Sequence, residues 1–170
     1  AGCREAWFGL ESGSQRVLKS IGKGTSVQTI KRAFKAARDA GIMRRSYVLL
    51  GTPLESLETI QETEALIDEV KPDTVSFSVL APYPGTEYYD EQKHGNLEWG
   101  KIDEYSGSVS LCSLSPVELN LERQRLLDKY RGNLSLIMQK KIALGVISTD
   151  EIPILQEEDF RTPWQGGNRN

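Results

Sequence analysis

A carboxylate follows the first apolar run of this chain, in the segment Gly9-Leu10-Glu11-Ser12-Gly13-Ser14. A carboxylate at a strand tip can accept hydrogen bonds from both hydroxyls of a ribose, while glycines let a ligand approach the backbone and the hydroxyls of Ser12 or Ser14 add donors. This set of residues suits a nucleoside. The same residues could instead cap a helix and place a negative charge at its N-terminus, so both interpretations stay open on this segment alone.

Three apolar runs in the first half of the chain each end in a loop of Gly, Pro and Ser or Thr. The runs cover residues 6–10, 47–50 and 75–80, and the loops cover residues 11–14, 51–53 and 81–86. Helical patterns over residues 14–21, 26–40 and 56–70 separate the runs. Because strands that alternate with helices form a parallel sheet, we expect all three loops on one rim, where such folds bind ligands.

The third strand, predicted over residues 74–80, shows the clearest pattern. Val75, Phe77 and Val79 alternate with Thr74, Ser76 and Ser78. One face is therefore apolar and the other is small and hydroxylated, which would leave a wet, roomy interior in a barrel. The fold class predicted is α/β, a partial TIM-type (β/α) barrel fragment with about three parallel strands and flanking helices. The alternative is a strand at a solvent-exposed edge.

The composition changes near residue 90. We expect residues 1–90 to form the barrel fragment and residues 91–170 to form a mainly helical C-terminal extension with a polar tail from Thr149. Ser115-Pro116-Val117-Glu118 is a capping box with Pro at the first helical position, and Gly132-Asn133 should interrupt the helix that follows.

Charge and cysteine usage narrow the class of protein. Lys and Arg number 21 against 24 Asp and Glu, a net charge of −3, which argues against broad binding to nucleic acid. No apolar run is long enough to span a membrane and no signal segment opens the sequence, so we expect a cytoplasmic protein. The two cysteines, Cys3 and Cys112, lie too far apart in sequence for a disulfide scaffold or a site of close thiolates.

Four short motifs follow one another along the chain. They are Ala6-Trp7-Phe8-Gly9-Leu10-Glu11-Ser12-Gly13-Ser14, Ala40-Gly41-Ile42, Leu50-Gly51-Thr52-Pro53-Leu54-Glu55-Ser56 and Phe77-Ser78-Val79-Leu80-Ala81-Pro82-Tyr83-Pro84-Gly85-Thr86. In this order they resemble the C-terminal half of the core barrel of radical S-adenosylmethionine (radical SAM) enzymes. The closest resemblance is to the group that often carries a cobalamin (B12)-binding domain, and it covers residues 1–90.

The resemblance implies a partial barrel in which a [4Fe-4S] cluster, held by three closely spaced cysteines, cleaves S-adenosylmethionine to a 5'-deoxyadenosyl radical. It further implies ribose or methionine contacts near the first strand, a shaped second loop and an adenine flanked by the third loop. Carried over to this sequence, the residues are Glu11, Ser12, Ser14, Gly51, Pro53, Leu80, Pro82 and Tyr83.

The second strand is predicted over Met43 to Leu50 and has a core composition apart from Arg44 and Arg45. If that strand is regular, one of the two side chains points inward. An inward arginine could pair with the carboxylate of the cofactor's methionine part, and we favour Arg45 for it. The alternative is that both arginines lie at the exposed start of the strand.

The sequence departs from the radical SAM pattern in its cysteines, because no Cys-x3-Cys-x2-Cys run is present. We therefore expect the cluster ligands to lie upstream, in the remainder of a longer parent chain, and this chain alone not to perform the chemistry. The parent would catalyse a methylation, a rearrangement or an oxidoreduction. The second loop also departs, with Thr52-Pro53-Leu54 where the family has Leu-Pro-Gly.

Two other functions stay open on the sequence. One is half of a closed TIM barrel acting on sugar phosphates, which would need an inward lysine or paired carboxylates. The other is a non-catalytic interaction module. Three strands cut from a larger sheet expose an edge and an apolar surface, so we also expect self-association, most simply as a symmetric homodimer.

Overall fold

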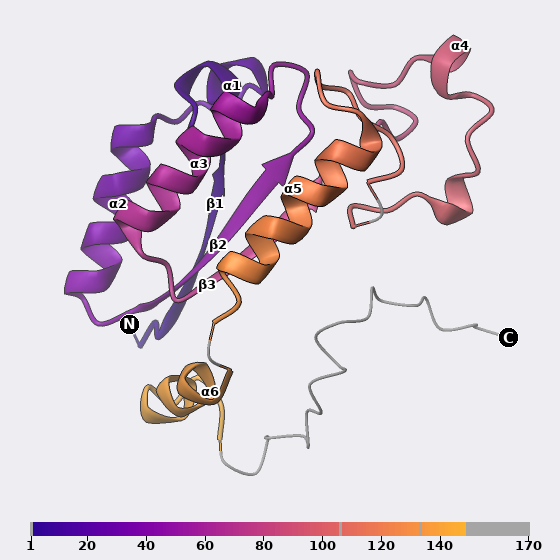
Figure 1. The fold of residues 1–170 in the computed structure, drawn as a ribbon. Coiled ribbons are helices and arrows are strands. Elements are labelled where there is room, and N and C mark those ends of the chain that lie inside the picture. The colour runs from indigo at the N-terminus through magenta and orange to yellow at the C-terminus, as the bar shows by residue number, and fades with distance from the viewer. Residues whose placement is uncertain (1, 106, 133, 149–170) are drawn as a thin grey trace, which may run out of the picture.

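Three parallel strands form the single sheet of the computed structural model, which describes residues 2–105, 107–132 and 134–148. The strands are β1 (Glu5–Glu11), β2 (Met43–Leu50) and β3 (Thr74–Val79), side by side in that order (Figure 1). The α/β prediction of a partial barrel fragment is confirmed. Because all three strands run the same way, their carboxyl ends and the loops that follow meet at one rim of the sheet.

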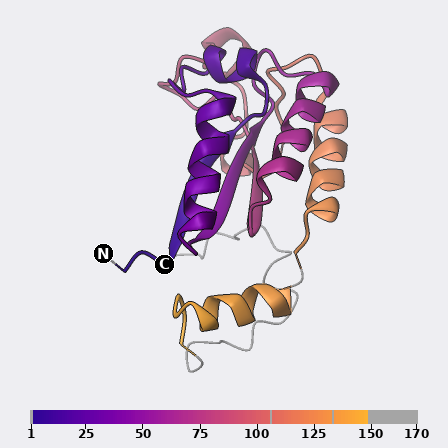
Figure 2. The same cartoon turned by 90° about the vertical axis from the view of Figure 1, so that its left-hand side faces the viewer.

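Helices cover one face of this sheet (Figure 2). They are α2 (Val27–Asp39), α3 (Leu57–Val70) and α5 (Pro116–Lys129), while the short α1 (Gln15–Ser20) lies at the rim. The ring of Phe34 in α2 packs on Phe8 of β1, with 4.5 Å between centroids, and Tyr130 after α5 packs on Phe77 of β3 at 6.0 Å. The two outer strands therefore have helices packed on the same side of the sheet.

The helices begin where the sequence predicts them. Ser26, Ser56 and Ser115 are the N-cap residues of α2, α3 and α5, and each side chain accepts a hydrogen bond from the backbone N–H three residues on. The apolar periodicity of residues 56–70 predicts Leu57 on the buried stripe of α3 together with Ile60, Ile67 and Val70, and for Leu57 this is wrong because it is half exposed. Side chains lean toward the N-terminus of their helix, so a residue in the first turn projects past the packed layer.

The core lies between the sheet and these helices. Its buried members include residues of all three strands and of the three covering helices: Leu10, Ile30, Phe34, Val48, Leu50, Ile60, Leu66, Ile67, Phe77, Val79, Leu119 and Leu126. Leu119 and Leu126 of α5 thus share one core with the strands. The division of the chain at residue 90 stays a prediction, since packing is continuous across it.

The segment between β3 and α5 is irregular apart from α4 (Glu91–His94) and the short 3-10 helix η1 (Trp99–Lys101). The helix α5 ends at Lys129, and beyond Gly132 the chain continues in a second helix, α6 (Leu134–Ala143). The interruption of the helix near Gly132 is the one that the sequence predicts. Ion pairs of Lys140 with Asp73 and of Lys141 with Glu5 hold α6 at the amino-terminal end of the sheet (Figure 1). The expected polar tail from Thr149 lies outside the described residues.

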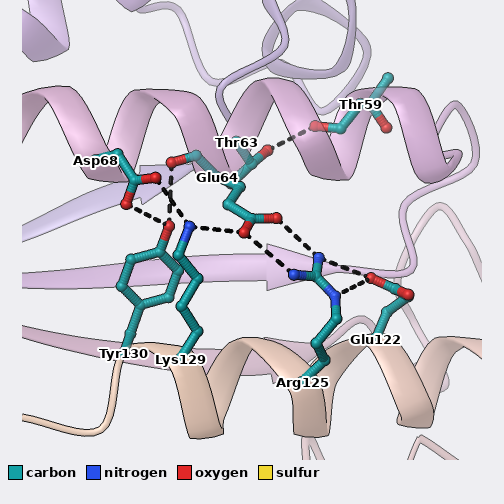
Figure 3. A network of polar contacts seen from close by, with 8 residues as sticks. All are labelled: Thr59, Thr63, Glu64, Asp68, Glu122, Arg125, Lys129 and Tyr130. Atoms are coloured by element: carbon teal, nitrogen blue, oxygen red, sulfur yellow. Dashed lines mark hydrogen bonds and ion pairs between the residues drawn. The ribbon is translucent and has the colours of Figure 1, made fainter.

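A polar network joins α3 to α5 along their length (Figure 3). The Glu64 carboxylate accepts hydrogen bonds from Arg125, at 2.8 and 3.1 Å, and from Lys129 at 2.7 Å. Asp68 accepts one from Lys129 and one from the Tyr130 hydroxyl, both at 2.8 Å. The hydrogen bonds from Arg125, followed by those from Lys129, lower the pKa of Glu64 to about 2. We call these residues the α3–α5 network.

The outer edge of β3 is partly covered by polar contacts. The Val79 amide donates to the Glu104 carbonyl at 2.7 Å, and Arg123 Nε donates to the Phe77 carbonyl at 3.0 Å. Within the described part of the chain, no strand pairs with the outer edge of β1. Further, none of the helices in that part is long and apolar enough to cross a membrane.

The α3–α5 network predicts a pH-dependent stability. Because the pKa of Glu64 is lowered from 4.5 to about 2, its contribution is present above pH 4.5 and is lost as the pH falls toward 2. Glu64→Gln should lower the free energy of unfolding by about 1 kcal/mol near neutral pH, a discounted value because Arg125 and Lys129 are partly exposed.

Urea unfolding of both proteins across this pH range measures the effect, and the difference should shrink toward the acid end. Glu58→Gln is the control, since Glu58 pairs with Arg16 at an exposed site and its loss should change little. A difference for Glu64→Gln that stays constant with pH would contradict the prediction.

Candidate functional site

The face of the sheet opposite the helices carries most of the polar and aromatic side chains of the strands. We call it the open face, and it contains Trp7, Gly9, Arg45, Tyr47, Leu49, Thr74, Ser76 and Ser78. Alternation along the strands sets this division, because Phe8, Leu10, Val48, Leu50, Phe77 and Val79 are the residues packed under the helices. The hydroxylated side of β3 therefore lies on the side that a barrel would enclose.

Glu11 lies at the tip of β1 and turns its carboxylate over the open face. A bulge interrupts the β1–β2 register between Gly9 and Glu11, and Glu11 takes a left-handed backbone conformation with φ of 60°. Its Oε1 accepts a hydrogen bond from Lys23 Nζ at 2.6 Å. The Glu11 side chain is 20% exposed and that of Lys23 36% exposed, so the pair is reachable from solvent.

Gly9 makes room for this ion pair. A Cβ at position 9 would lie 2.5 Å from Glu11 Oε1 and 2.7 Å from Lys23 Nζ. Any other residue would therefore displace one of the two charged groups. Lys23 was missed as a functional residue because, between Gly22 and Gly24, it reads as part of the turn that ends α1. The signal that could have identified Lys23 is that it follows the candidate ligand Glu11 closely in the sequence.

Ser12 and Ser14 are both buried beneath the rim. The Ser12 hydroxyl lies 3.2 Å from Thr63 Oγ1 of α3 and accepts a hydrogen bond from the Ser14 amide at 3.1 Å. The Gly13 amide donates to the same Thr63 oxygen at 2.9 Å. Ser14 is the N-cap residue of α1, but its side chain makes no capping hydrogen bond. These contacts attach the β1 loop to α3, and a direct ligand contact by either serine stays a prediction.

The β2 loop is held by a buried carboxylate. The Gly51 amide, at a residue with φ of +79°, donates to Glu55 Oε2, and the Glu55 side chain is only 1% exposed. Burial raises the pKa of Glu55 to about 7, against the opposing effect of hydrogen bonds from the Gly51 and Thr52 amides. Pro53 is exposed at the rim. No pattern in the sequence indicates that Glu55 is buried.

The β3 loop lies next to the β2 loop. The Leu80 amide donates to the Leu50 carbonyl at 2.8 Å, and a Cβ on Gly51 would lie 3.8 Å from the Leu80 nitrogen. Pro82 is buried, whereas Tyr83 is exposed and its ring lies 6.3 Å from that of Trp99. Gly51 and Leu80 are therefore brought together, and Glu11 lies on the neighbouring strand of the same rim.

Arg44 and Arg45 point to opposite faces of the sheet. Arg44 is buried on the helix side and pairs with Asp73, with 3.1 Å between Nε and Oδ2. Arg45 lies on the open face, 5.2 Å from the ring centroid of Trp7 and 5.5 Å from that of Tyr47. Glu11 is opposite Val48, so Arg45 lies about 10 Å farther down the sheet. A bond from Arg45 to the cofactor stays a prediction.

No group of three or more His, Cys, Asp or Glu in the described ranges could hold a metal ion. Cys3 is exposed near the start of β1, and Cys112 is partly buried beside Ser110, so the two thiols do not meet. These residues do not fit an iron–sulfur cluster.

A surface cavity lies at the opposite end of the sheet from the rim, between the ends of α3 and α5, and is lined by Ile67, Asp68, residues 71–75 and residues 129–132.

Comparison with known proteins gives relatives of three kinds. The chain is 30% identical over 166 residues, 98% of its length, to an anaerobic magnesium-protoporphyrin IX monomethyl ester cyclase of Cereibacter sphaeroides. It is 33% identical over 96 residues, 56% of its length, to an uncharacterized methyltransferase of Pyrococcus horikoshii. It is 31% identical over 121 residues, 64% of its length, to a tRNA-2-methylthio-N(6)-dimethylallyladenosine synthase of Aromatoleum aromaticum. No family model matches the chain.

The chain belongs to the radical SAM superfamily. The resemblance drawn from the four motifs is thereby confirmed. This radical SAM chain spans about a quarter of the length of these relatives, covering 24%, 21% and 27% of them. It therefore corresponds to one part of such an enzyme.

Glu55 predicts a second pH effect, opposite in sign to that of Glu64. Its pKa rises from 4.5 to about 7 in the folded chain, so its contribution to stability is full below pH 4.5 and falls as the pH rises through 7. Glu55→Gln keeps an oxygen for the Gly51 amide and removes the charge. Relative to this variant, the wild-type chain should lose about 3 kcal/mol of unfolding free energy over that range.

Chemical denaturation at a series of pH values measures both proteins. Glu69→Gln serves as the control, because Glu69 is an exposed carboxylate on the same helix and pairs with Lys31. If the wild-type and Glu55→Gln profiles run parallel from pH 4.5 to 7, the buried carboxylate does not titrate there and the prediction is wrong.

Proposed function

We propose that this radical SAM chain binds the nucleoside part of S-adenosylmethionine at its rim. The observation that carries the proposal is the Glu11–Lys23 pair, a solvent-reachable carboxylate and ammonium held together over Gly9 at a strand tip. The carboxylate would accept hydrogen bonds from the ribose hydroxyls. The ammonium beside it would attract the carboxylate of the cofactor's methionine part.

The neighbouring loops would hold the base. Gly51 and Leu80 lie side by side on the rim, with Pro53, Pro82 and Tyr83 around them. The Gly51 and Leu80 amides are already bonded to Glu55 and to the Leu50 carbonyl, so carbonyl groups of these loops would accept hydrogen bonds from the adenine amino group. The exposed rings of Pro53 and Tyr83 would cover the faces of the base. Ser12 and Ser14 would act from below by fixing the β1 loop to α3.

The cluster does not belong to this chain. Since the described cysteines do not fit a [4Fe-4S] cluster, its ligands would come from the remainder of the parent chain. That remainder would sit against the free edge of β1 and the open face. The chain's own residues would then orient the cofactor and exclude water from it.

The relatives support a class of reaction for the parent. Their names describe methyl transfer, methylthio modification of tRNA and an anaerobic cyclisation. We propose a parent of the methyltransferase or oxidoreductase type, acting in the cytoplasm, with a cobalamin domain as a further part. A homodimer through the β1 edge is the corresponding proposal for this chain alone.

Titration with 5'-deoxyadenosine tests the role of Glu11. Glu11→Gln should weaken binding at least about tenfold, because hydrogen bonds to a charged acceptor contribute about 1.5 to 3 kcal/mol. Glu69→Gln is the matched control, since Glu69 also pairs with a lysine at 2.6 Å but lies on α3, away from the rim. Calorimetry measures the three affinities. Equal affinity in wild type and Glu11→Gln would remove Glu11 from the site.

A further inference from the structure

Glu55 is a buried carboxylate without a cationic partner. Its side chain is 1% exposed, and it forms no ion pair with any residue in the described part of the chain. Its Oε2 accepts a hydrogen bond from the Gly51 amide, the Thr52 amide donates to the same carboxylate, and Oε1 is buried with no hydrogen-bond partner. Lost hydration favours the protonated form of such a group, whereas the two amides favour the ionised form. Glu55 is therefore placed to gain or lose a proton near neutral pH.

The elements packed around Glu55 bring no charge to it. The turn at Gly51 contacts Val79 of β3 and Leu119 of α5, and the Ser113 hydroxyl donates to the Glu55 carbonyl at 3.0 Å. The strand β3 has no titratable side chain. On the other elements the titratable side chains closest in sequence are bonded elsewhere: Glu58 of α3 to Arg16, Cys112 to the Leu114 carbonyl and Glu118 of α5 to Ser115. Burial, which raises the pKa of Glu55 to about 7, is opposed only by the two backbone amides.

The turn at Gly51 cannot move independently of the β3 loop. A Cβ at Gly51 would lie 2.9 Å from Leu119 Cδ2, 3.2 Å from Val79 Cγ1 and 3.8 Å from the Leu80 nitrogen. The Leu80 amide in turn donates to the Leu50 carbonyl at 2.8 Å, which attaches the β3 loop to the residue before Gly51. A displacement of the Gly51 backbone therefore also displaces the start of the β3 loop.

Protonation of Glu55 changes the hydrogen bonds that hold this turn. Hydrogen bonds to an ionised carboxylate are roughly twice as strong as those to a neutral group. A proton on Oε1 weakens the bonds from both amides and adds a buried donor that needs an acceptor. The Thr52 hydroxyl is also buried and unpartnered, so it is the side chain of this turn that such a donor would draw toward it. The ionised form therefore holds the turn more tightly than the protonated form.

We propose that Glu55 is a positioning residue of the nucleoside site, and that its ionised form holds the β2 and β3 loops in the arrangement that binds the base. Proton uptake by Glu55 loosens both loops, so the proton and the nucleoside oppose each other's binding although they do not touch. The link to the nucleoside rests on the proposed function, which assigns the base to these loops. The coupling of the two loops to Glu55 does not.

A pH titration of the free chain tests the coupling of the loops. The amide chemical shifts of Gly51, Thr52 and Leu80 should change together, with one midpoint near pH 7, the pKa of the Glu55 carboxyl. Glu55→Gln should remove this titration. Glu58→Gln, which alters an exposed carboxylate at the start of α3, should leave it unchanged. If the Leu80 amide does not titrate with Glu55, the two loops are not coupled to it and the proposal is wrong, whatever the chain binds.

The affinity for 5'-deoxyadenosine, which has no group that titrates between pH 6 and pH 8, tests the positioning role. With a pKa of about 7, about a tenth of Glu55 is ionised at pH 6 and about nine tenths at pH 8. The wild-type affinity should therefore rise about tenfold over this range, and that of Glu55→Gln should stay constant. His94→Gln is the control, because a histidine can also titrate in this range, and it should keep the wild-type profile.

The outcomes separate this inference from the proposed function. Equal wild-type affinity at both pH values, or a rise that persists in Glu55→Gln, would overturn the positioning role and leave the nucleoside site in place. A rise that is lost in His94→Gln would assign the pH dependence to the histidine and would also overturn it. Absence of binding at every pH would contradict the proposed function itself, and the positioning role with it.

Discussion

The structure depends on one constraint, namely that α2, α3 and α5 all pack on the same face of the three parallel strands. Phe8, Val48 and Phe77 pack under α2, α3 and α5, and the aromatic contacts of Phe34 and Tyr130 show that the cover reaches both outer strands. Strand alternation then assigns the remaining side chains to the open face. The polar and aromatic groups that could bind ligands are therefore gathered on one side without any further arrangement.

The rim keeps its shape through internal hydrogen bonds. Ser12 and Gly13 attach the first loop to Thr63, and the Glu55 carboxylate attaches the second loop to its own helix through the Gly51 amide. The polar groups of these residues are already hydrogen-bonded within the protein. Glu11 differs from them because its carboxylate is directed over Gly9 to the solvent-reachable side, where Lys23 meets it. Loop structure and ligand contact are thus divided between different residues.

The strands and helices could be predicted because their signals are local. Apolar alternation predicts β3 and the Ser56 cap predicts the start of α3, and both signals depend only on neighbouring residues. What the sequence could not show depends on contacts between distant segments. Lys23 joins Glu11 only because a bulge turns the end of β1, and Glu55, a charged residue after Thr-Pro-Leu, gives no local sign of its 1% exposure.

The two arginines show the same limit. Alternation predicts that Arg44 and Arg45 face opposite sides, but only the fold decides which one meets Asp73. Ser12 and Ser14 likewise have the composition of ligand donors, and their burial against Thr63 follows from where α3 packs. Motifs can thus identify a rim, while the assignment of single side chains within it needs the packed structure.

Amide chemical-shift mapping with 5'-deoxyadenosine tests the central claim most directly. A nucleoside bound at the rim should shift the amides of Gly9, Glu11, Gly51 and Leu80 together and leave residues 71–75 and 129–132, at the far end of the sheet, unchanged. Shifts confined to those far residues, around the cavity between α3 and α5, would contradict the account.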